Sequence, residues 1–354
     1  MNKLGIVVGS LGRGGAERVS IYLASYFKSH GWDCDIITHS KQTNEYELPV
    51  GVKRYVSYEN NVSIPQKINK IRNKIKESSP NIILIMDTPL CTYTVPALTG
   101  LKIPFVVSER NDPTHFSGNK LNIKIARFLM KKASGFVFQT NDAKRFYEKS
   151  LHGKGTVIPN PLVIENMPAV YSGEREKRIV TVGRLHMQKN HAMLIKAFAE
   201  IHKKYPEYFL DIYGEGPLEN ELKRLCRKLG ISDYVCFHGN VTDVVERIKK
   251  SAMFVMSSDF EGMPNALIEA MAVGLPCIST DCPIGGPKDL IENEVNGQLV
   301  KVCDDVEMVK KITYFIENPT LAEICGKSAV NIRRKLDSDL IGKCWLEYFE
   351  KILI

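Results

Sequence analysis

Short apolar runs alternate with longer amphipathic stretches along almost the whole chain, and this alternation limits what the chain can fold into. Runs such as 82–86 and 253–256 have the length and the branched or large apolar residues typical of buried strands. Stretches such as 16–29 and 191–204 show the apolar spacing of amphipathic helices. Strand and helix in regular alternation favour repeated βα units around parallel sheets. The predicted fold class is α/β.

The alternation occurs twice, and a chain of 354 residues is long for one domain. Pro159-Asn160-Pro161 and the polar stretch 166–177 interrupt it. Two doubly wound sheets joined by one linker would face each other across a cleft, with ligands at the carboxyl ends of the strands. We therefore predict two facing Rossmann-like domains and a final helix, over residues 1–170, 171–335 and 336–354.

Composition excludes several classes of protein. No apolar run approaches the ~20 residues that span a bilayer. Glycine interrupts the start of the chain too early for a signal peptide, so we expect a cytoplasmic protein. The nine cysteines are scattered and never spaced as Cys-x-x-Cys, which predicts reduced thiols.

Positive charge is concentrated in the first half. Residues 1–170 contain 23 Lys and Arg against 13 Asp and Glu, and the remainder contains 25 against 27. This surplus implies an anionic partner, either a membrane surface or a phosphorylated acceptor, and favours nucleic acid less. Two basic amphipathic helices, around 64–75 and 121–129, allow two interpretations. Their apolar stripes either pack in the core, which the pattern favours, or contact anionic lipid.

An acidic segment follows the apolar run 252–256. Glu261 precedes a predicted helix that opens at Pro264, a residue suited to the first helical position. A helix start at a strand end leaves free N–H groups and a positive dipole end, which together bind anions. Glu269 on this helix could accept hydrogen bonds from sugar hydroxyls. Amides for a phosphate and acids for hydroxyls predict a nucleotide-sugar pocket.

Two cations and several glycines follow other strands. Arg184 and Lys189 could together bind a diphosphate. The alternative, which would be favoured for an arbitrary loop, is that they are two solvated charges in a turn. Glycines at strand ends would let backbone approach a ligand, or could form plain turns. The glycine loop near residue 14 matches neither a Walker P-loop nor a dinucleotide fingerprint. These glycines are Gly14, Gly15, Gly214 and Gly239.

Taken in order, these segments resemble the retaining family-4 glycosyltransferases, whose two Rossmann-like domains form the GT-B fold. The resemblance implies catalytic roles for Arg184, Lys189 and Glu261. It implies a UDP-sugar or a GDP-sugar as donor and favours the UDP-sugar, although the sequence does not specify the base. It implies no cofactor and no metal. The donor-binding residues it implies are Gly14, Gly15, Gly214, Gly239, Val241, Gly262, Met263, Pro264, Asn265 and Glu269.

Within that family the chain most resembles bacterial enzymes that build capsule, O-antigen or exopolysaccharide on polyprenyl diphosphate. This implies transfer of a hexose or N-acetylhexosamine to a glycan or lipid-linked acceptor, with peripheral contact at the inner face of the membrane. Glu109 and Arg110 would lie on the acceptor side, and many relatives carry histidine where Arg110 stands. The resemblance implies that the last helix crosses back and packs on the first domain. The alternative is that this helix packs on the second domain. The sequence does not indicate the oligomeric state.

Other functions remain open. A nucleotide-sugar 2-epimerase would turn over UDP-GlcNAc without an acceptor, and a binding protein would take the donor without transfer. A dehydrogenase is disfavoured by the spacing of the glycines. Asp33-Cys-Asp35 and Asp337-Ser-Asp339 fit the Asp-x-Asp pattern of metal-dependent glycosyltransferases, but neither follows a predicted strand. Because Arg184 and Lys189 would supply the positive charge, no metal is predicted.

Overall fold

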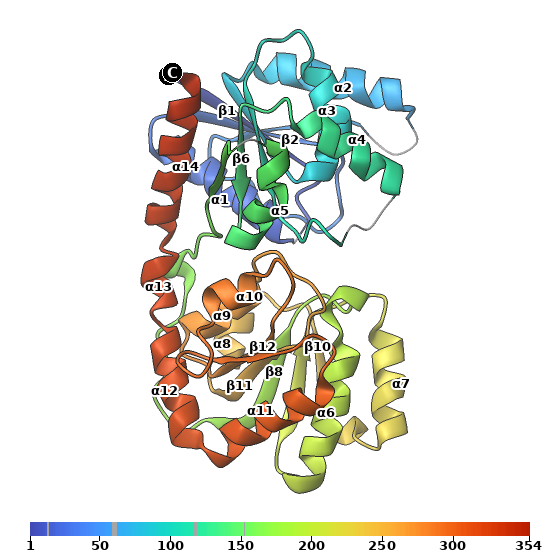
Figure 1. The fold of residues 1–354 in the computed structure, drawn as a ribbon, viewed down its shortest axis with the longest axis vertical. Helices are drawn as coiled ribbons and strands as arrows, with labels where there is room; N and C mark the ends of the chain where they lie inside the picture. The colour runs from blue at the N-terminus through green and yellow to red at the C-terminus, as the bar shows by residue number, and fades with distance from the viewer. Residues whose placement is uncertain (13, 59–61, 116–118, 152) are drawn as a thin grey trace. The chain divides into compact units, whose positions relative to one another are not determined.

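The structure, a computed structural model, contains two compact units (Figure 1). Unit 1 consists of Met1–Pro161 and Ser338–Ile354, and unit 2 of Leu162–Asp337. Each unit is a parallel sheet with helices, so the predicted α/β class is confirmed. The structure describes residues 1–12, 14–58, 62–115, 119–151 and 153–354. No helix in these ranges is both long enough and apolar enough to cross a bilayer.

Unit 1 is built on a seven-stranded sheet in the order β3-β2-β1-β4-β5-β6-β7, with every neighbouring pair parallel. All residues of β4 and β5 are buried, as expected for central parallel strands covered on both faces. The edge strand β3 is half exposed and has no apolar run, so the alternation did not predict it. The strands are β1 (Lys3–Val8), β2 (Asp33–Thr38), β3 (Lys53–Val56), β4 (Ile82–Met86), β5 (Phe105–Glu109), β6 (Gly135–Phe138) and β7 (Gly155–Val157).

The last helix of the chain, α14, packs on helix α1 of unit 1 (Figure 1). Trp345 and Phe349 of α14 are fully buried in one apolar cluster with Phe27 of α1. The rings of Phe27 and Phe349 meet edge to face with centroids 5.5 Å apart. The tail therefore completes the core of unit 1. The helices of this unit are α1 (Gly15–Ser29), α2 (Ile64–Ser78), α3 (Cys91–Leu98), α4 (Lys120–Met130), α5 (Asn141–Leu151) and α14 (Ser338–Leu353), with a 3-10 turn η1 (Thr88–Leu90).

Unit 2 contains a six-stranded parallel sheet in the order β10-β9-β8-β11-β12-β13. This is the strand order of a doubly wound Rossmann-like sheet. Its strands are β8 (Glu176–Val182), β9 (Phe209–Tyr213), β10 (Val235–Gly239), β11 (Ser251–Met256), β12 (Cys277–Thr280) and β13 (Gln298–Val300). Its helices are α6 (His191–Lys204), α7 (Glu219–Leu229), α8 (Val244–Ile248), α9 (Asn265–Ala272), α10 (Gly286–Leu290), α11 (Asp305–Glu317), α12 (Pro319–Ala329) and α13 (Ile332–Lys335), with 3-10 turns η2 (Ile164–Asn166), η3 (Met187–Lys189) and η4 (Ser232–Tyr234).

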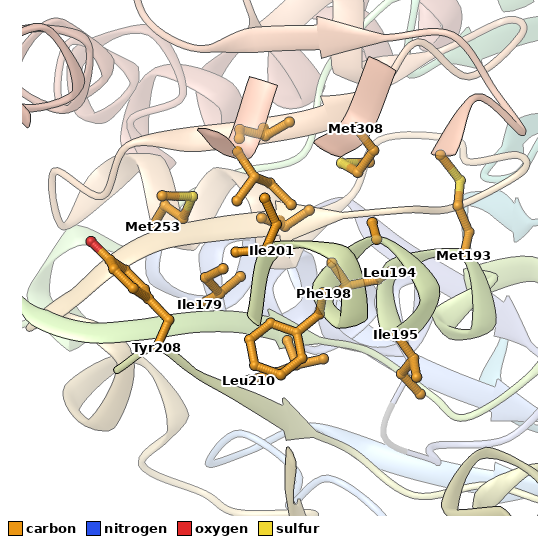
Figure 2. Packing of buried hydrophobic residues seen from close by; sticks show 14 of the residues in the cluster. Ile179, Met193, Leu194, Ile195, Phe198, Ile201, Tyr208, Leu210, Met253 and Met308 are labelled. Carbon is orange, nitrogen blue, oxygen red and sulfur yellow. The ribbon is translucent and has the colours of Figure 1, made fainter. Parts of the chain in front are cut away.

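Helix α6 covers one face of the unit 2 sheet, and Figure 2 shows this part of the core. Leu194, Phe198 and Ile201 recur at helical spacing, and each is at most 1% exposed. They belong to one buried cluster with Ile179 of β8 and Leu210 of β9 (Figure 2). The apolar stripe that predicted this helix from sequence is the face that holds it on the sheet.

The boundary between the units lies after Pro161, whereas the sequence predicted it after residue 170. Leu162 is 1% exposed and belongs to an apolar cluster of unit 2. Its N–H donates to the carbonyl of Leu336 (2.7 Å), and a β-bridge joins it to Asp337. These contacts bind the start and the end of unit 2 together, so 162–170 belongs to unit 2. The unit likewise ends at residue 337 rather than 335.

Candidate active site

Apart from Gly14 and Gly15, which belong to unit 1, the residues predicted to bind the donor belong to unit 2, and several lie at one edge of its sheet. Arg184 and Lys189 follow β8, Gly214 follows β9, and Glu261 follows β11. Gly239 is the last residue of β10. Because the strands are parallel, their carboxyl ends meet at the same edge, where ligands bind in such sheets. The structure therefore brings these residues together within one unit. The two that are farthest apart in the sequence, Arg184 and Glu261, are separated by 77 positions.

Lys189 and Glu261 form an ion pair at this edge. Nζ of Lys189 lies 2.5 Å from Oε1 of Glu261, and the side chains are 15% and 8% exposed. Ser258 Oγ donates to the same carboxylate oxygen (2.7 Å). An ammonium group has three donors, so Lys189 can keep this contact and still donate to an anion. The pair fixes the position of the lysine before any ligand binds.

Residues that the sequence analysis did not single out also hold the backbone at Lys189 and Asn190 by hydrogen bonds. Ser257 Oγ lies 3.0 Å from the carbonyl oxygens of both Lys189 and Asn190. Asn190 has a left-handed backbone (φ 43°) and donates through Nδ2 to Asp259 (2.7 Å). Ser257 is the first residue after β11 and Asp259 the third, and this position at a strand end is the signal that could have identified them.

Arg184 differs from Lys189 in exposure and in partners. Its side chain is exposed, and within the part of the chain that the structure describes it has no ion pair or hydrogen bond. Its backbone is held, because the next residue, Leu185, is fully buried and its N–H donates to the carbonyl of Glu215 (2.9 Å). A rigid peptide thus presents a guanidinium group that has the planar donors suited to a phosphate.

Helix α9 begins at Asn265, one residue later than the predicted start at Pro264. Pro264 has an extended backbone (ψ 109°) and is the N-cap, whose carbonyl accepts the hydrogen bond from Ile268 N (3.2 Å). The first N–H groups of a helix have no partner within it, so the helix start remains suited to an anion. On the following turns, Glu269 is 9% exposed.

The glycine-containing turn before α10 supports the loop 262–264. Gly286 N donates to the carbonyl of Gly262 (2.7 Å). A Cβ atom at Gly286 would lie 2.5 Å from that oxygen and 2.6 Å from Cα of Met263. Only glycine therefore allows this close approach of two backbones. Met263 itself is buried, at 8% exposed, and belongs to an apolar cluster of unit 2, so both backbone and side-chain contacts hold the loop before α9.

Two predicted glycines, Gly214 and Gly239, connect neighbouring loops of the same edge. Gly214 N donates to the carbonyl of Gly239 (2.7 Å). Both have positive φ, 132° and 66° respectively, which favours glycine. A Cβ atom at Gly214 would lie 2.1 Å from the carbonyl oxygen of Gly183, next to Arg184. Val241, two residues after Gly239, is half-buried.

In unit 1, Gly14 and Gly15 form the start of α1. Gly14 is the N-cap, and Gly15 is the first helical residue. The loop before them is held by Glu45, whose Oε1 accepts from Leu11 N (3.3 Å) and whose Oε2 pairs with Arg54 (2.5 Å). The hydrogen bond from Arg54 is the main cause that lowers the pKa of Glu45 to about 2. No spacing in the sequence marks Glu45 or Arg54, because β3, which carries Arg54, was itself not predicted.

The predicted acceptor-side residues Glu109 and Arg110 lie at the carboxyl edge of the unit 1 sheet and are buried, at 4% and 9% exposed. Glu109 Oε2 accepts from Thr88 Oγ1 (2.6 Å) and from Tyr147 OH (2.8 Å). Arg110 Nη2 donates to Asn160 Oδ1. Burial lowers the pKa of Arg110 to about 10, against the opposing effect of neighbouring acids. Both residues are therefore parts of a buried polar network.

The first Asp-x-Asp match lies at the opposite edge of the unit 1 sheet. Asp33 and Asp35 are at the amino end of β2. Nζ of Lys28 lies 2.9 Å from Asp33, and Nζ of Lys3 lies 2.7 Å from Asp35. Each aspartate thus has a lysine partner, and this match is accounted for by ion pairs at an edge remote from the strand ends that bind ligands.

One cluster in unit 2 has the residue types of a metal site. Ligand atoms of Asp211, Cys236 and His238 lie within 4.8 Å of one another. Both carboxylate oxygens of Asp211, however, accept from Arg178 Nη1 (2.7 Å each), and Oδ1 also lies 2.8 Å from His238 Nε2. A guanidinium group thus occupies the position of a cation, and the residues do not fit a metal ion.

Comparison with known proteins identifies the family. A family model described as Glycosyltransferase Family 4 matches residues 13–166, and one described as Glycosyl transferases group 1 matches residues 164–331. This chain belongs to the family-4 glycosyltransferases. The predicted family, its GT-B fold and its enzymatic nature are thereby confirmed. An uncharacterized glycosyltransferase of Haemophilus influenzae is 29% identical to it over 330 residues, which are 91% of this chain and 92% of the relative.

Two further proteins resemble this glycosyltransferase over its whole length. One is the Campylobacter jejuni GalNAc-alpha-(1->4)-GalNAc-alpha-(1->3)-diNAcBac-PP-undecaprenol alpha-1,4-N-acetyl-D-galactosaminyltransferase, 27% identical over 368 residues and 99% of each chain. The other is a TarM mutant of S. aureus, solved in complex with Fondaparinux, alpha-GlcNAc-glycerol and UDP. It superposes with a TM-score of 0.84 at 15% identity, over 99% of this chain and 100% of TarM, and this likeness shows the fold.

Proposed function

We propose that this glycosyltransferase transfers a hexose or N-acetylhexosamine from a UDP-sugar to a glycan or polyprenyl-diphosphate-linked acceptor, with retention of the anomeric configuration, in the synthesis of a cell-surface polysaccharide. The observation that carries the proposal is the pair of cations after β8, one fixed by Glu261 and one exposed. The undecaprenol-diphosphate acceptor of the Campylobacter relative supports the acceptor class, and UDP in the TarM complex supports the base.

The donor's parts match separate groups at the edge of unit 2. Arg184, Lys189 and the amides of 262–265 would bind the diphosphate. Glu269 would accept hydrogen bonds from the ribose hydroxyls, and Glu261 would bind the transferred sugar. Gly214, Gly239 and Val241 would lie beside the nucleoside. These groups need no metal ion.

In the proposed reaction the acceptor oxygen attacks the anomeric carbon on the face from which the diphosphate departs. One carbon–oxygen bond forms, the bond to the diphosphate oxygen breaks, and the hydroxyl proton leaves with the diphosphate. Negative charge grows on the departing group, where the two cations stabilise it. No pair of carboxylates acting as nucleophile and acid is required, in contrast to a glycosidase.

A nucleotide screen tests the donor assignment. UDP at about 100 times its Kd should raise the melting temperature by about 5–10 °C, because ligand binding at that excess adds about 2.7 kcal/mol. GDP should give a smaller shift. The Glu269→Gln variant should fold like the wild type and show a reduced UDP shift, because one hydroxyl contact is weakened. An absent UDP shift, or a larger shift with GDP, would contradict the donor assignment.

Transfer itself is tested with the UDP-sugar that gives the largest shift and a panel of polyprenyl-diphosphate-linked N-acetylhexosamines. We expect a glycosylated lipid whose new linkage keeps the donor's α configuration, which NMR of the product shows. Release of UDP with conversion of UDP-GlcNAc in the absence of acceptor would identify an epimerase instead, and binding without turnover would identify a binding protein.

The surface of α4 supports contact with an anionic membrane. Leu121, Ile125 and Phe128 recur at helical spacing and are 61%, 40% and 67% exposed. Ile123, Ala126 and Met130, on another face, are the buried residues of this helix. The exposed apolar stripe thus differs from the buried one, and basic residues border it at Lys120, Lys124, Lys131 and Lys132. Apolar side chains bordered by lysines are the composition of a helix that lies on anionic lipid.

Vesicle sedimentation tests this surface. The wild type should bind phosphatidylglycerol vesicles more tightly than phosphatidylcholine vesicles, and salt should weaken the binding. Replacing Leu121, Ile125 and Phe128 by serine should reduce the partition coefficient at least about tenfold, because their apolar area then stays in water. The matched control replaces exposed Val306 and Ile324 of unit 2 by serine. Equal partitioning of the two variants would contradict the role of α4.

A further inference from the structure

A buried glutamine of unit 2, Gln188, joins the loop that carries the two cations to the loop after β11. It lies in η3, directly before Lys189, and is 9% exposed. Its carbonyl accepts from Asp259 N (2.8 Å), and its side-chain Nε2 donates to the carbonyl of Phe260 (2.9 Å). The main chain and the side chain of one residue thus each hold a peptide of the second loop. The peptide that Nε2 holds is the one that contains the nitrogen of Glu261.

A second buried residue, Ser258, binds the carboxylate of Glu261 directly. Ser258 is fully buried, and its Oγ donates to Glu261 Oε1 (2.7 Å). Its own carbonyl accepts from Thr280 Oγ1 (2.6 Å) and from Cys282 Sγ (3.2 Å). Thr280 is the last residue of β12, and Cys282 follows it in the next loop. The end of β12 therefore fixes the backbone of Ser258, and Ser258 fixes the side chain of Glu261.

The two oxygens of the Glu261 carboxylate are used unequally. An ionised carboxylate has about two lone pairs on each oxygen. Oε1 accepts from both Lys189 Nζ and Ser258 Oγ, which occupies both of its lone pairs. The contact that the described residues supply to Oε2 is Gln188 Nε2 at 3.5 Å, which is long for a hydrogen bond. Oε2 is therefore the oxygen that can still accept a strong hydrogen bond.

This carboxylate has more donors than its charge requires. Lys189 by itself balances the charge of Glu261. Burying an ion pair is weak evidence for a gain in stability, because taking two charges out of water costs as much as their attraction returns. What Gln188 and Ser258 add is a fixed position and a fixed orientation of the acid relative to the lysine. Such precision matters for a reaction, since a displacement of about 1 Å at a site can cost about 100-fold in rate.

We propose that Gln188 and Ser258 are positioning residues, which hold Glu261 so that its Oε2 accepts a hydroxyl group of the transferred sugar. This inference deepens the proposed function and depends on it. Gln188 joins the acid to the loop of Arg184 and Lys189, so the distance between the diphosphate-binding cations and the sugar-binding acid is set within unit 2. Both residues act through Glu261 rather than by touching the donor.

Calorimetric titration with UDP, and with the UDP-sugar on which the wild type acts, tests this role. The variants are Gln188→Leu and Ser258→Ala. Each should bind UDP within about twofold of the wild type, because UDP lacks the transferred sugar. The Kd for the UDP-sugar should rise about tenfold, the effect of losing one hydrogen bond to a charged group, and kcat should fall at least as much. A general loss of structure would weaken both ligands together.

A double-mutant cycle shows whether the two residues act through Glu261. In a Glu261→Ala background, adding Gln188→Leu or Ser258→Ala should change the Kd for the UDP-sugar by less than about twofold, since the group that they position is absent. A further tenfold loss in that background would overturn the inference. Equal weakening of UDP and UDP-sugar in the single variants, or wild-type affinity for both, would overturn it as well. Ser258→Ala removes a single oxygen atom and keeps the carbonyl contacts, so it decides the question even if Gln188→Leu does not fold.

The matched controls are Gln298→Leu and Ser279→Ala, which make the same substitutions at fully buried positions of β13 and β12. In the described part of the chain the side chain of Gln298 has no hydrogen-bond partner, and Ser279 Oγ donates to the carbonyl of Thr280 (3.0 Å). Both variants should bind UDP and the UDP-sugar like the wild type, and a tenfold change in either would overturn the assignment to Gln188 and Ser258. Failure of the wild type to bind UDP or to transfer would instead overturn the proposed function.

Discussion

Replacing Arg184 by alanine should lower kcat about 100- to 1000-fold, the effect of removing one preorganised group that stabilises charge in a transition state. The melting temperature should stay the same, because the side chain is exposed and makes no ion pair or hydrogen bond in the described part of the chain. Steady-state kinetics with saturating UDP-sugar, together with thermal unfolding, check both halves of this expectation. Wild-type turnover in this variant would remove the diphosphate assignment.

The Lys189→Ala variant should lose a similar factor in kcat but should also unfold more easily. Removal of the Lys189 side chain leaves the carboxylate of Glu261, which is 8% exposed, without its cation. Such an unpaired buried carboxylate lowers the free energy of unfolding by about 3–5 kcal/mol. The Lys189→Ala, Glu261→Gln double variant should regain stability without regaining turnover, because the neutral amide needs no cation. Lys196→Ala, an exposed lysine of α6, is the matched control and should change neither quantity.

The largest expected effect on stability is that of Gly214→Ala. The new Cβ would lie 2.1 Å from the carbonyl oxygen of Gly183, a backbone atom that cannot rotate away, and the φ of 132° is strained for alanine. We expect unit 2 to lose about 4 kcal/mol or more, which lowers its melting temperature by about 10 °C. The displaced Gly183 peptide would move Arg184, so the UDP-induced shift should fall as well.

Gly230→Ala is the control that separates strain from collision. Gly230 ends α7 with a φ of 71°, and no atom lies within 4 Å of its Cβ position. Alanine there should cost only the strain of a left-handed backbone, about 1–2 kcal/mol, and leave the UDP shift intact. Similar losses in the two variants, measured by chemical denaturation, would show that the close approach of Gly214 to Gly183 has no role.

The strands of the central sheets could be predicted because their signal is local. The run 82–86 coincides with β4, and the run 253–256 forms the end of β11, since strands buried on both faces are continuously apolar. The half-exposed β3 lacks that signal, and the strand was missed. The start of α9 was misplaced by one residue, because proline is acceptable both at the N-cap and at the first helical position.

The apolar stripes of the basic helices show a different limit. The spacing of Leu121 and Ile125 is compatible with a core face, which the sequence analysis favoured, and with a lipid face. In the structure Ile123 and Met130 form the buried face of α4, and Leu121 is 61% exposed. In α2, by contrast, Ile71 and Ile75 are fully buried. Only the packing of neighbouring helices decides which stripe of a two-sided helix is covered.

The sequence by itself determined the two series of βα units, and with them which loops share a sheet edge. Parallel strands put all their carboxyl ends together, so Arg184, Lys189 and Glu261 could be grouped before any coordinates existed. Only the tertiary structure decided which side chains are partners. The ion pair of Lys189 with Glu261, the support of the glycine loop by Glu45, and the hydrogen bond from Tyr147 to Glu109 join residues on different helices, strands or loops. Apolar periodicity and turn residues are signals that extend over only a few neighbouring residues. These contacts, in contrast, join side chains that are far apart in the sequence and meet only when the chain folds.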